Sequence, residues 1–129
     1  MNCIIIEDDL LSQESLLRNC EKFGKELKVL GVFGSAESAK EFINSCENTI
    51  DLIFTDVVLP GKNGLEFISD LLIVPYVILT TSHDKYAVKA FDLNVVDFLK
   101  KPFLYSRFEQ SLKKIENLTD KDSIGNINV

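Results

Sequence analysis

Acidic, hydroxyl and basic side chains in this chain directly follow short apolar runs, and together they could bind a metal ion and transfer a phosphoryl group. The residues of this set are Glu7, Asp8 and Asp9; Asp56; Thr81 and Ser82; and Lys101. Carboxylates suit Mg²⁺, which takes one or two of them and keeps several waters. An aspartate beside such an ion can attack phosphorus and form an acyl phosphate. An ammonium and a hydroxyl can share the charge of the phosphoryl oxygens.

These side chains can act together only if the fold brings them to one place. Asp56 ends the run 52–55, which is long enough for a buried strand but short for a helix. In an open parallel α/β sheet, ligands bind at the carboxyl ends of the strands. Because several carboxylates in one pocket repel one another, a divalent cation is needed there to offset the repulsion.

Five apolar, β-rich runs alternate along the chain with five amphipathic segments. The predicted strands are residues 3–6, 28–33, 52–56, 76–80 and 95–99. The predicted helical stripes lie in residues 16–23, 39–46, 65–72, 86–91 and 104–115. Gly24 is a predicted helix stop, Ser35 a predicted N-cap, and residues 60–64 a loop whose glycines allow unusual dihedral angles. Alternation of this kind predicts a parallel sheet with helices on both faces.

Length, charge and cysteine content limit the possible functions. The 129 residues predict one domain, and the net charge of −6 argues against direct nucleic-acid binding. No apolar run is long enough for a membrane span, and the first residues lack the pattern of a signal peptide. Cys3, Cys20 and Cys46 are widely spaced and odd in number, which favours core thiols in a reducing cytoplasm.

Each member of the polar set also has an ordinary structural interpretation. Glu7 and Asp9 could be solvated charges at a helix start, and Thr81 could be a β-branched strand end. Lys101 could be a surface lysine, as most lysines are. His83 has no histidine or cysteine partner, so we interpret it as a loop residue. The agreement of four strand ends favours a shared site.

The ordered set resembles the receiver domain of two-component response regulators, the CheY-like family. The resemblance rests on the acidic group 7–9, Asp56, the loop 60–64, Thr81-Ser82 and Lys101-Pro102, and it extends from Asn2 to about Leu118. It implies a doubly wound five-stranded parallel sheet in the order 2-1-3-4-5, flanked by five helices. It also implies a receiver domain at 1–118, followed by a polar tail or linker stub at 119–129.

The resemblance further implies a role for each site residue. Asp56 would accept a phosphoryl group from a sensor histidine kinase. Asp8, Asp56 and the backbone carbonyl of Val58 would bind Mg²⁺ directly, while Glu7 would act mainly through water. A register that uses Asp8 and Asp9 is the alternative, although Glu7-Asp8 follows the strand directly, as in the family.

A switch between two shapes is the family's way of signalling. The resemblance implies that the Thr81 hydroxyl moves toward the phosphoryl group and that Phe98 turns inward with it. The family commonly has tyrosine at the Phe98 position, so a plain core phenylalanine is the equal alternative. The Lys101-Pro102 bond resembles the family's cis peptide.

Residues 81–91 and 94–99 resemble receivers that are joined to LytTR DNA-binding domains. Either such an output domain belongs after residue 118, or the receiver acts alone. The resemblance places the output surface on the fourth helix, the fifth strand and the last helix. Tyr86, Lys89, Asp92, Asp97 and Lys113 lie on or near it, and they suit a homodimer strengthened by phosphorylation.

Two other functions compete with a phosphoacceptor switch. A Mg²⁺-dependent phosphatase of the haloacid dehalogenase class also uses a strand-end aspartate, but it needs a second aspartate where this chain has Val58. A degenerate receiver that works without phosphorylation is the other. The presence of Asp8, Asp56, Thr81 and Lys101 together argues against it.

Overall fold

Five parallel strands form one sheet in the computed structural model, which describes the backbone of residues 1–127 and the side chains of residues 1–87 and 89–119. The strands are β1 (Asn2–Ile6), β2 (Lys28–Phe33), β3 (Leu52–Asp56), β4 (Tyr76–Thr81) and β5 (Asp97–Lys100). Their order is β2-β1-β3-β4-β5, and every neighbouring pair is parallel. The predicted doubly wound sheet is therefore confirmed.

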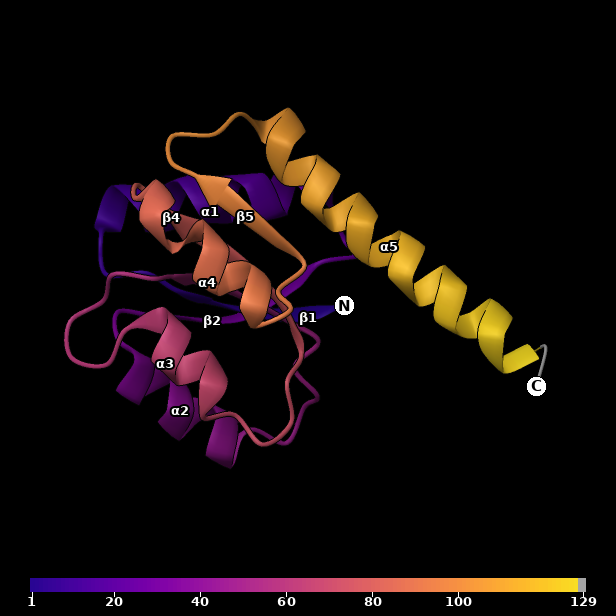
Figure 1. Cartoon of the computed structure of the whole chain (residues 1–129), viewed down its shortest axis with the longest axis horizontal. Helices are drawn as coiled ribbons and strands as arrows, with labels where there is room; N and C mark the ends of the chain where they lie inside the picture. Colours follow the sequence, from indigo (N-terminus) through magenta and orange to yellow (C-terminus); the bar gives the residue numbers. More distant parts are fainter. Residues whose placement is uncertain (128–129) are drawn as a thin grey trace.

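Helices cover both faces of this sheet (Figure 1). They are α1 (Leu10–Phe23), α2 (Ala36–Ser45), α3 (Gly64–Ser69), α4 (Ala87–Asp92) and α5 (Tyr105–Ile127), with a short 3-10 helix η1 (Asp84–Tyr86) before α4. Because successive strand residues point to opposite faces, the core divides into two layers. One layer joins the sheet to α2, α3 and α4, and the other joins it to α1 and α5.

Capping residues set the helix boundaries next to the sheet. The Asp9 carboxylate accepts a hydrogen bond of 2.9 Å from the Ser12 N–H at the start of α1. Ser35 caps α2 through the Ser38 N–H, as predicted from the sequence. Gly24 ends α1 with φ 110°, a left-handed value that favours glycine. Asp9 therefore serves α1 as its N-cap.

The third and fourth helices differ from the sequence prediction. The predicted third stripe runs to residue 72, but α3 ends at Ser69 and Leu72 is fully exposed. The chain must reach β4 within a few residues, and Pro75 disfavours helix in the residue before it. Phe91 of α4 is 85% exposed, so the fourth stripe is only partly a core stripe.

The last helix is longer than the predicted stripe 104–115. Helix α5 runs to Ile127 and its second half extends away from the sheet (Figure 1). The segment predicted as a tail, residues 119–129, is therefore helical through Ile127. The single glycine within this segment does not end the helix, because glycine costs a helix only about 1 kcal/mol. The boundary between receiver and tail at residue 118 stays a prediction. Within residues 1–127, no helix combines the length and apolar character needed to cross a membrane.

Candidate functional site

The register of the sheet brings the predicted site residues to one edge. Ile6 of β1 pairs with Thr55 of β3, so the residues that follow them, Glu7 and Asp56, are neighbours across the two strands. Asp56 pairs in turn with Thr80 of β4. Thr81 ends β4 beside Lys100 of β5, and the Lys101 N–H donates to the Thr81 carbonyl at 2.8 Å.

Three carboxylates meet at this edge. Glu7, Asp8 and Asp56 each offer an oxygen atom, and these oxygens all lie within 4.8 Å of one another. Glu7 is fully buried, Asp56 is 8% exposed, and Asp8 is exposed. This all-oxygen donor set, open to solvent on the Asp8 side, fits a hard divalent cation such as Mg²⁺.

Lys101 bridges two of these carboxylates. Its ammonium donates to Glu7 Oε1 and, at 2.9 Å, to Asp56 Oδ2. Burial opposes the charged form of this lysine, but the hydrogen bonds to Glu7 and Asp56 outweigh it and raise the pKa of Lys101. Lys101 is therefore held against the two carboxylates, and the interpretation as a surface lysine is wrong.

The pKa of Glu7 is shifted mainly by burial, although its carboxylate takes part in the same ion pair as Lys101. Burial raises the pKa of the Glu7 carboxyl, and the hydrogen bonds from Lys101 and from the Asp9 N–H offset only part of that shift. The neighbouring Asp56 charge raises it further. Burial dominates because Glu7 has no exposed surface at all.

Thr81 and Phe98 lie on the opposite face of the sheet from Lys101. Thr81 is fully buried, and its hydroxyl accepts a long hydrogen bond of 3.4 Å from the His83 N–H. Phe98 is half-buried and packs against the core layer of α2, α3 and α4. Val58, the predicted carbonyl ligand, is 44% exposed, and its N–H donates to Asp56 Oδ1 at 3.2 Å.

The loop after β3 fixes the position of Asp56. The Gly64 N–H donates to the Val57 carbonyl at 2.8 Å, and a Cβ on Gly64 would lie 2.1 Å from the Asp56 carbonyl oxygen. Gly61 has φ 74°, and Asn63 caps α3 through the Glu66 N–H. The peptide bond Lys101-Pro102 after β5 is cis, as the resemblance implied.

The structure also reveals, for two polar groups, surroundings that the sequence analysis did not predict. Asp97 is buried and accepts hydrogen bonds from both terminal nitrogens of Arg107 and from Ser111. Among the described side chains, Thr80 Oγ1 is the buried polar atom without a hydrogen-bond partner. Strand alternation could have shown that Thr80 shares a face with Asp56, but neither its lack of a partner nor the contacts of Asp97 can be read from spacing.

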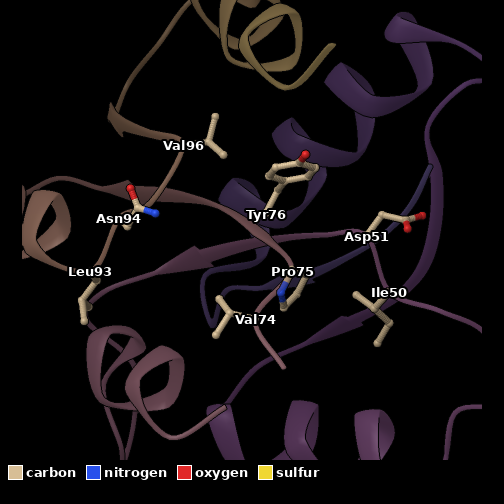
Figure 2. A pocket seen from close by; sticks show the side chains of 8 residues that line it. All are labelled: Ile50, Asp51, Val74, Pro75, Tyr76, Leu93, Asn94 and Val96. Atoms are coloured by element: carbon tan, nitrogen blue, oxygen red, sulfur yellow. The ribbon is translucent and has the colours of Figure 1, made fainter. Parts of the chain in front are cut away.

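A cavity of about 600 Å³ lies at the other end of the strands. Figure 2 shows its lining, with Asp51 and Tyr76 at the starts of β3 and β4 and Asn94 before β5. Asp56, Thr81 and Lys101 contribute nothing to this cavity. It is therefore separate from the carboxylate site.

Comparison with known proteins identifies the family. The sequence model of the response regulator receiver domain matches residues 3–113. This chain belongs to the response regulator receiver family. Receiver domains are signalling switches of two-component systems, and membership agrees with the resemblance predicted from Asp56, Thr81 and Lys101.

Curated relatives and a solved structure support this assignment. Transcriptional regulatory protein LytR of Staphylococcus aureus is 35% identical over 126 residues, which cover 95% of this chain and 50% of LytR. Sensory transduction protein LytR of Staphylococcus epidermidis is 33% identical over 94% of this chain and 48% of its own length. The response regulatory domain of mrkE from Klebsiella pneumoniae superposes with a TM-score of 0.83 at 27% identity, covering 94% of this chain and 99% of that one. The chain thus spans about half the length of the curated relatives it matches.

Proposed function

We propose that this receiver is a phosphoacceptor, in which Asp56 takes a phosphoryl group from the phosphohistidine of a sensor kinase. An Asp56 carboxylate oxygen attacks phosphorus, the bond from phosphorus to the histidine nitrogen breaks, and an acyl phosphate forms on Asp56. The observation that carries the proposal is the Lys101 ammonium bonded to Asp56 beside two further carboxylates. Phosphoryl transfer depends on a positioned nucleophile and on positive charge near the phosphoryl oxygens, and this arrangement can supply both.

Mg²⁺ is the cation that we propose for the acidic cluster. Asp8, Asp56 and the Val58 carbonyl would hold it, with Glu7 acting through water. When bound, it would supply positive charge for the phosphoryl oxygens. The support is the donor chemistry: three carboxylates lie at one edge, two of them are buried, and the Lys101 ammonium is the one that the described part of the chain pairs with them.

Lys101 and Thr81 would stabilise the product. The Lys101 ammonium already donates to Asp56 Oδ2, so it lies beside the place where phosphoryl charge would appear. Among the described residues, the contact of the Thr81 hydroxyl is a long hydrogen bond of 3.4 Å from the His83 N–H, so reorienting this hydroxyl would cost little. We infer that Thr81 turns toward the phosphoryl group and that Phe98, on the same face, moves with it.

Output through a partner or an effector domain completes the proposal. Both curated relatives extend to about twice the length covered here, and the name of the S. aureus protein describes transcriptional regulation. We propose that phosphorylation changes the α4-β5-α5 surface and strengthens a homodimer, which would control transcription through an effector domain. The described cysteines are free thiols, which supports a cytoplasmic location with the sensor kinase.

Incubation with acetyl phosphate and Mg²⁺, followed by mass spectrometry, tests the proposal. We expect one phosphoryl group on Asp56, none on Asp56→Asn, and a wild-type amount on the matched control Asp92→Asn, which changes an exposed aspartate of α4. Asp56→Asn should remain folded, because the amide keeps the shape and relieves carboxylate repulsion. An undiminished adduct on Asp56→Asn would contradict the assignment.

A further inference from the structure

Thr80 lies in the row of paired residues that runs across the sheet from Asp56 of β3 to β5, the strand that precedes Lys101. On β3 and β4, Asp56 pairs with Thr80, and on β4 and β5, Thr80 pairs with Leu99. Ile78 and Leu99 face the core layer of α1 and α5, so alternation puts Thr80 on that same face. Thr80 therefore lies on the strand next to Asp56 and on the same face of the sheet.

The Lys101 side chain must cross this row. Lys101 follows β5, while its ammonium donates to Asp56 at the end of β3, and β4 lies between those two strands. Neighbouring strands are about 4.8 Å apart, so about two such intervals separate β3 from β5, and the side chains of Lys101 and Asp56 together bridge them across β4. Thr80 is the β4 residue that pairs with Asp56 and shares its face, so it lies beneath the path of the lysine.

Both groups have unused hydrogen-bonding capacity in this state. A lysine ammonium has three N–H donors, and the contacts of Lys101 that the structure describes use two, to Glu7 and Asp56. Thr80 Oγ1 is fully buried and has no partner among the described side chains. Leaving a buried hydroxyl unpaired is unfavourable, so such a group calls for an explanation.

We propose that the Thr80 hydroxyl is a positioning group for Lys101, which accepts its third N–H when a divalent cation competes for Glu7 and Asp56. The inference rests on the proposed role of Asp56 as phosphoacceptor. A cation beside the carboxylates would offset part of their negative charge and so weaken the attraction between Glu7 and Lys101. An acceptor on β4 then keeps the ammonium above Asp56, where the phosphoryl charge develops.

Substitutions at Thr80 separate this role from simple packing. Thr80→Val keeps the shape and removes the hydroxyl, whereas Thr80→Ser keeps the hydroxyl and removes the methyl group. With Mg²⁺ and saturating acetyl phosphate, we expect the valine variant to form the Asp56 adduct about tenfold more slowly, the effect of one lost hydrogen bond to a charged group. The serine variant should react at nearly the wild-type rate, and the half-saturating acetyl phosphate concentration should stay unchanged in both.

Two measurements that do not depend on turnover accompany the rates. Urea unfolding without Mg²⁺ should show Thr80→Val as stable as wild type or more so, because an unpaired buried hydroxyl is gone. The matched control Thr55→Val should lose stability, since the buried Thr55 hydroxyl donates to the Asp56 carbonyl at 2.9 Å. With Mg²⁺ and beryllofluoride, NMR of isotope-labelled lysine should show a protected Lys101 ammonium in wild type and Thr80→Ser but not in Thr80→Val.

The outcomes distinguish this inference from the proposed function. If wild type forms no adduct, the phosphoacceptor role itself fails. If wild type reacts and Thr80→Val reacts equally fast, the positioning role is wrong while the function of Asp56 stands. Slow reaction of both Thr80→Val and Thr80→Ser would show that packing, and not the hydroxyl, matters. Should the valine variant not fold, Thr80→Ala provides the same comparison with Thr80→Ser.

Discussion

Gly64 lies so close to the Asp56 backbone that no side chain fits there. A Cβ there would meet the Asp56 carbonyl oxygen at 2.1 Å, and a backbone atom cannot move aside as a flexible side chain can. We expect Gly64→Ala to lower the free energy of unfolding by about 1–3 kcal/mol, the usual cost of overpacking. Urea unfolding measures this. Gly34→Ala is the matched control, because a Cβ at Gly34 meets nothing within 4 Å and its backbone is not left-handed. Equal stability of the two variants would contradict the steric argument.

Asp8 is the exposed member of the acidic cluster, and its removal should weaken Mg²⁺ binding without disturbing the core. Ligand that binds only the folded state raises the melting temperature by mass action. We therefore expect Mg²⁺ to raise the melting temperature of wild type and to leave Asp8→Ala almost unchanged. Thermal melts with and without Mg²⁺ measure this, and Ca²⁺-free buffer is required throughout. The proposed ligand set fails if Asp8→Ala shows the full wild-type shift.

The sequence marks Asp9 as a candidate site residue but does not decide whether Asp9 belongs to the metal site. The sequence presents three consecutive acidic residues after β1, and spacing alone left the registers Glu7-Asp8 and Asp8-Asp9 both possible. In the structure the Asp9 carboxylate caps α1, while Glu7 points into the buried edge with Lys101. Which of three adjacent acidic residues caps a helix depends on the backbone dihedral angles at the helix start, and the sequence does not reveal those angles.

A buried ion pair connects helix α5 to strand β5. Asp97 begins β5, and Arg107 and Ser111 of α5 donate to its carboxylate at 2.6–2.8 Å, with Lys114 at 3.2 Å. Burial alone would raise the pKa of Asp97, but the hydrogen bonds from Arg107 and Ser111 outweigh it and hold the pKa well below its usual range. The charged form of Asp97 therefore stabilises the attachment of α5.

This attachment predicts a pH-dependent difference in stability. Because the folded-state pKa of Asp97 is lowered, its contribution is complete above the ordinary aspartate pKa of about 4 and is lost as the pH falls through the lowered value. We expect Asp97→Asn to lower the free energy of unfolding by about 1–2 kcal/mol at neutral pH, because Arg107 is partly exposed and solvent screens the pair.

Urea unfolding of wild type and Asp97→Asn between neutral and acidic pH measures the difference. The difference in unfolding free energy between the two proteins should narrow below about pH 4, because Asp97 of the unfolded chain takes up a proton there while the folded carboxylate stays charged to more acidic pH. Asp92→Asn, a change of an exposed acid on α4, is the control and should show little effect at any pH. A gap that stays constant down to strongly acidic pH would mean that Asp97 acts through packing and not through its charge.

The elements themselves were largely predictable, and the exceptions have physical causes. Alternating apolar runs gave the five strands, and Ser35 and Gly24 act as the predicted boundaries, because caps and stops are local signals. Leu72 fits the helical period but is exposed, since periodicity does not show where the chain must turn toward β4. The network around Asp97 joins residues ten and more positions apart through tertiary packing, so no local pattern could indicate it.

In the molecule as a whole, the predicted site residues lie on two different faces of the sheet. Glu7, Asp56 and Lys101 lie toward α1 and α5, whereas Thr81 and Phe98 lie toward α2, α3 and α4. The β4 and β5 backbone and the side chains of Thr81 and Phe98 therefore offer a route by which a change at Asp56 can reach α4. This arrangement suits a two-state switch, in which the phosphorylated state gains contacts that the resting state lacks.

The surface that would report this switch is α4, β5 and α5. Phe91 of α4 is 85% exposed, which gives this surface an apolar side chain in addition to the exposed charges of Lys89 and Lys113. Asp97, expected from the sequence on or near the surface, is instead buried within the attachment of α5. A surface that combines an exposed aromatic side chain with charged residues is suited to a weak symmetric interface.

We predict weak self-association that phosphorylation strengthens. A phosphoryl group adds up to about two negative charges and strong acceptor oxygens at Asp56, and Lys101 and Thr81 can both donate to them. Sedimentation of the protein with Mg²⁺, with and without beryllofluoride, should show a shift toward dimer with the mimic. Phe91→Ser should weaken that dimer, whereas Leu72→Ser, which changes an equally exposed residue in the loop between α3 and β4, should not. If the mimic binds and the protein remains monomeric at every concentration, output does not run through self-association of this domain, and a different partner must bind the α4-β5-α5 surface.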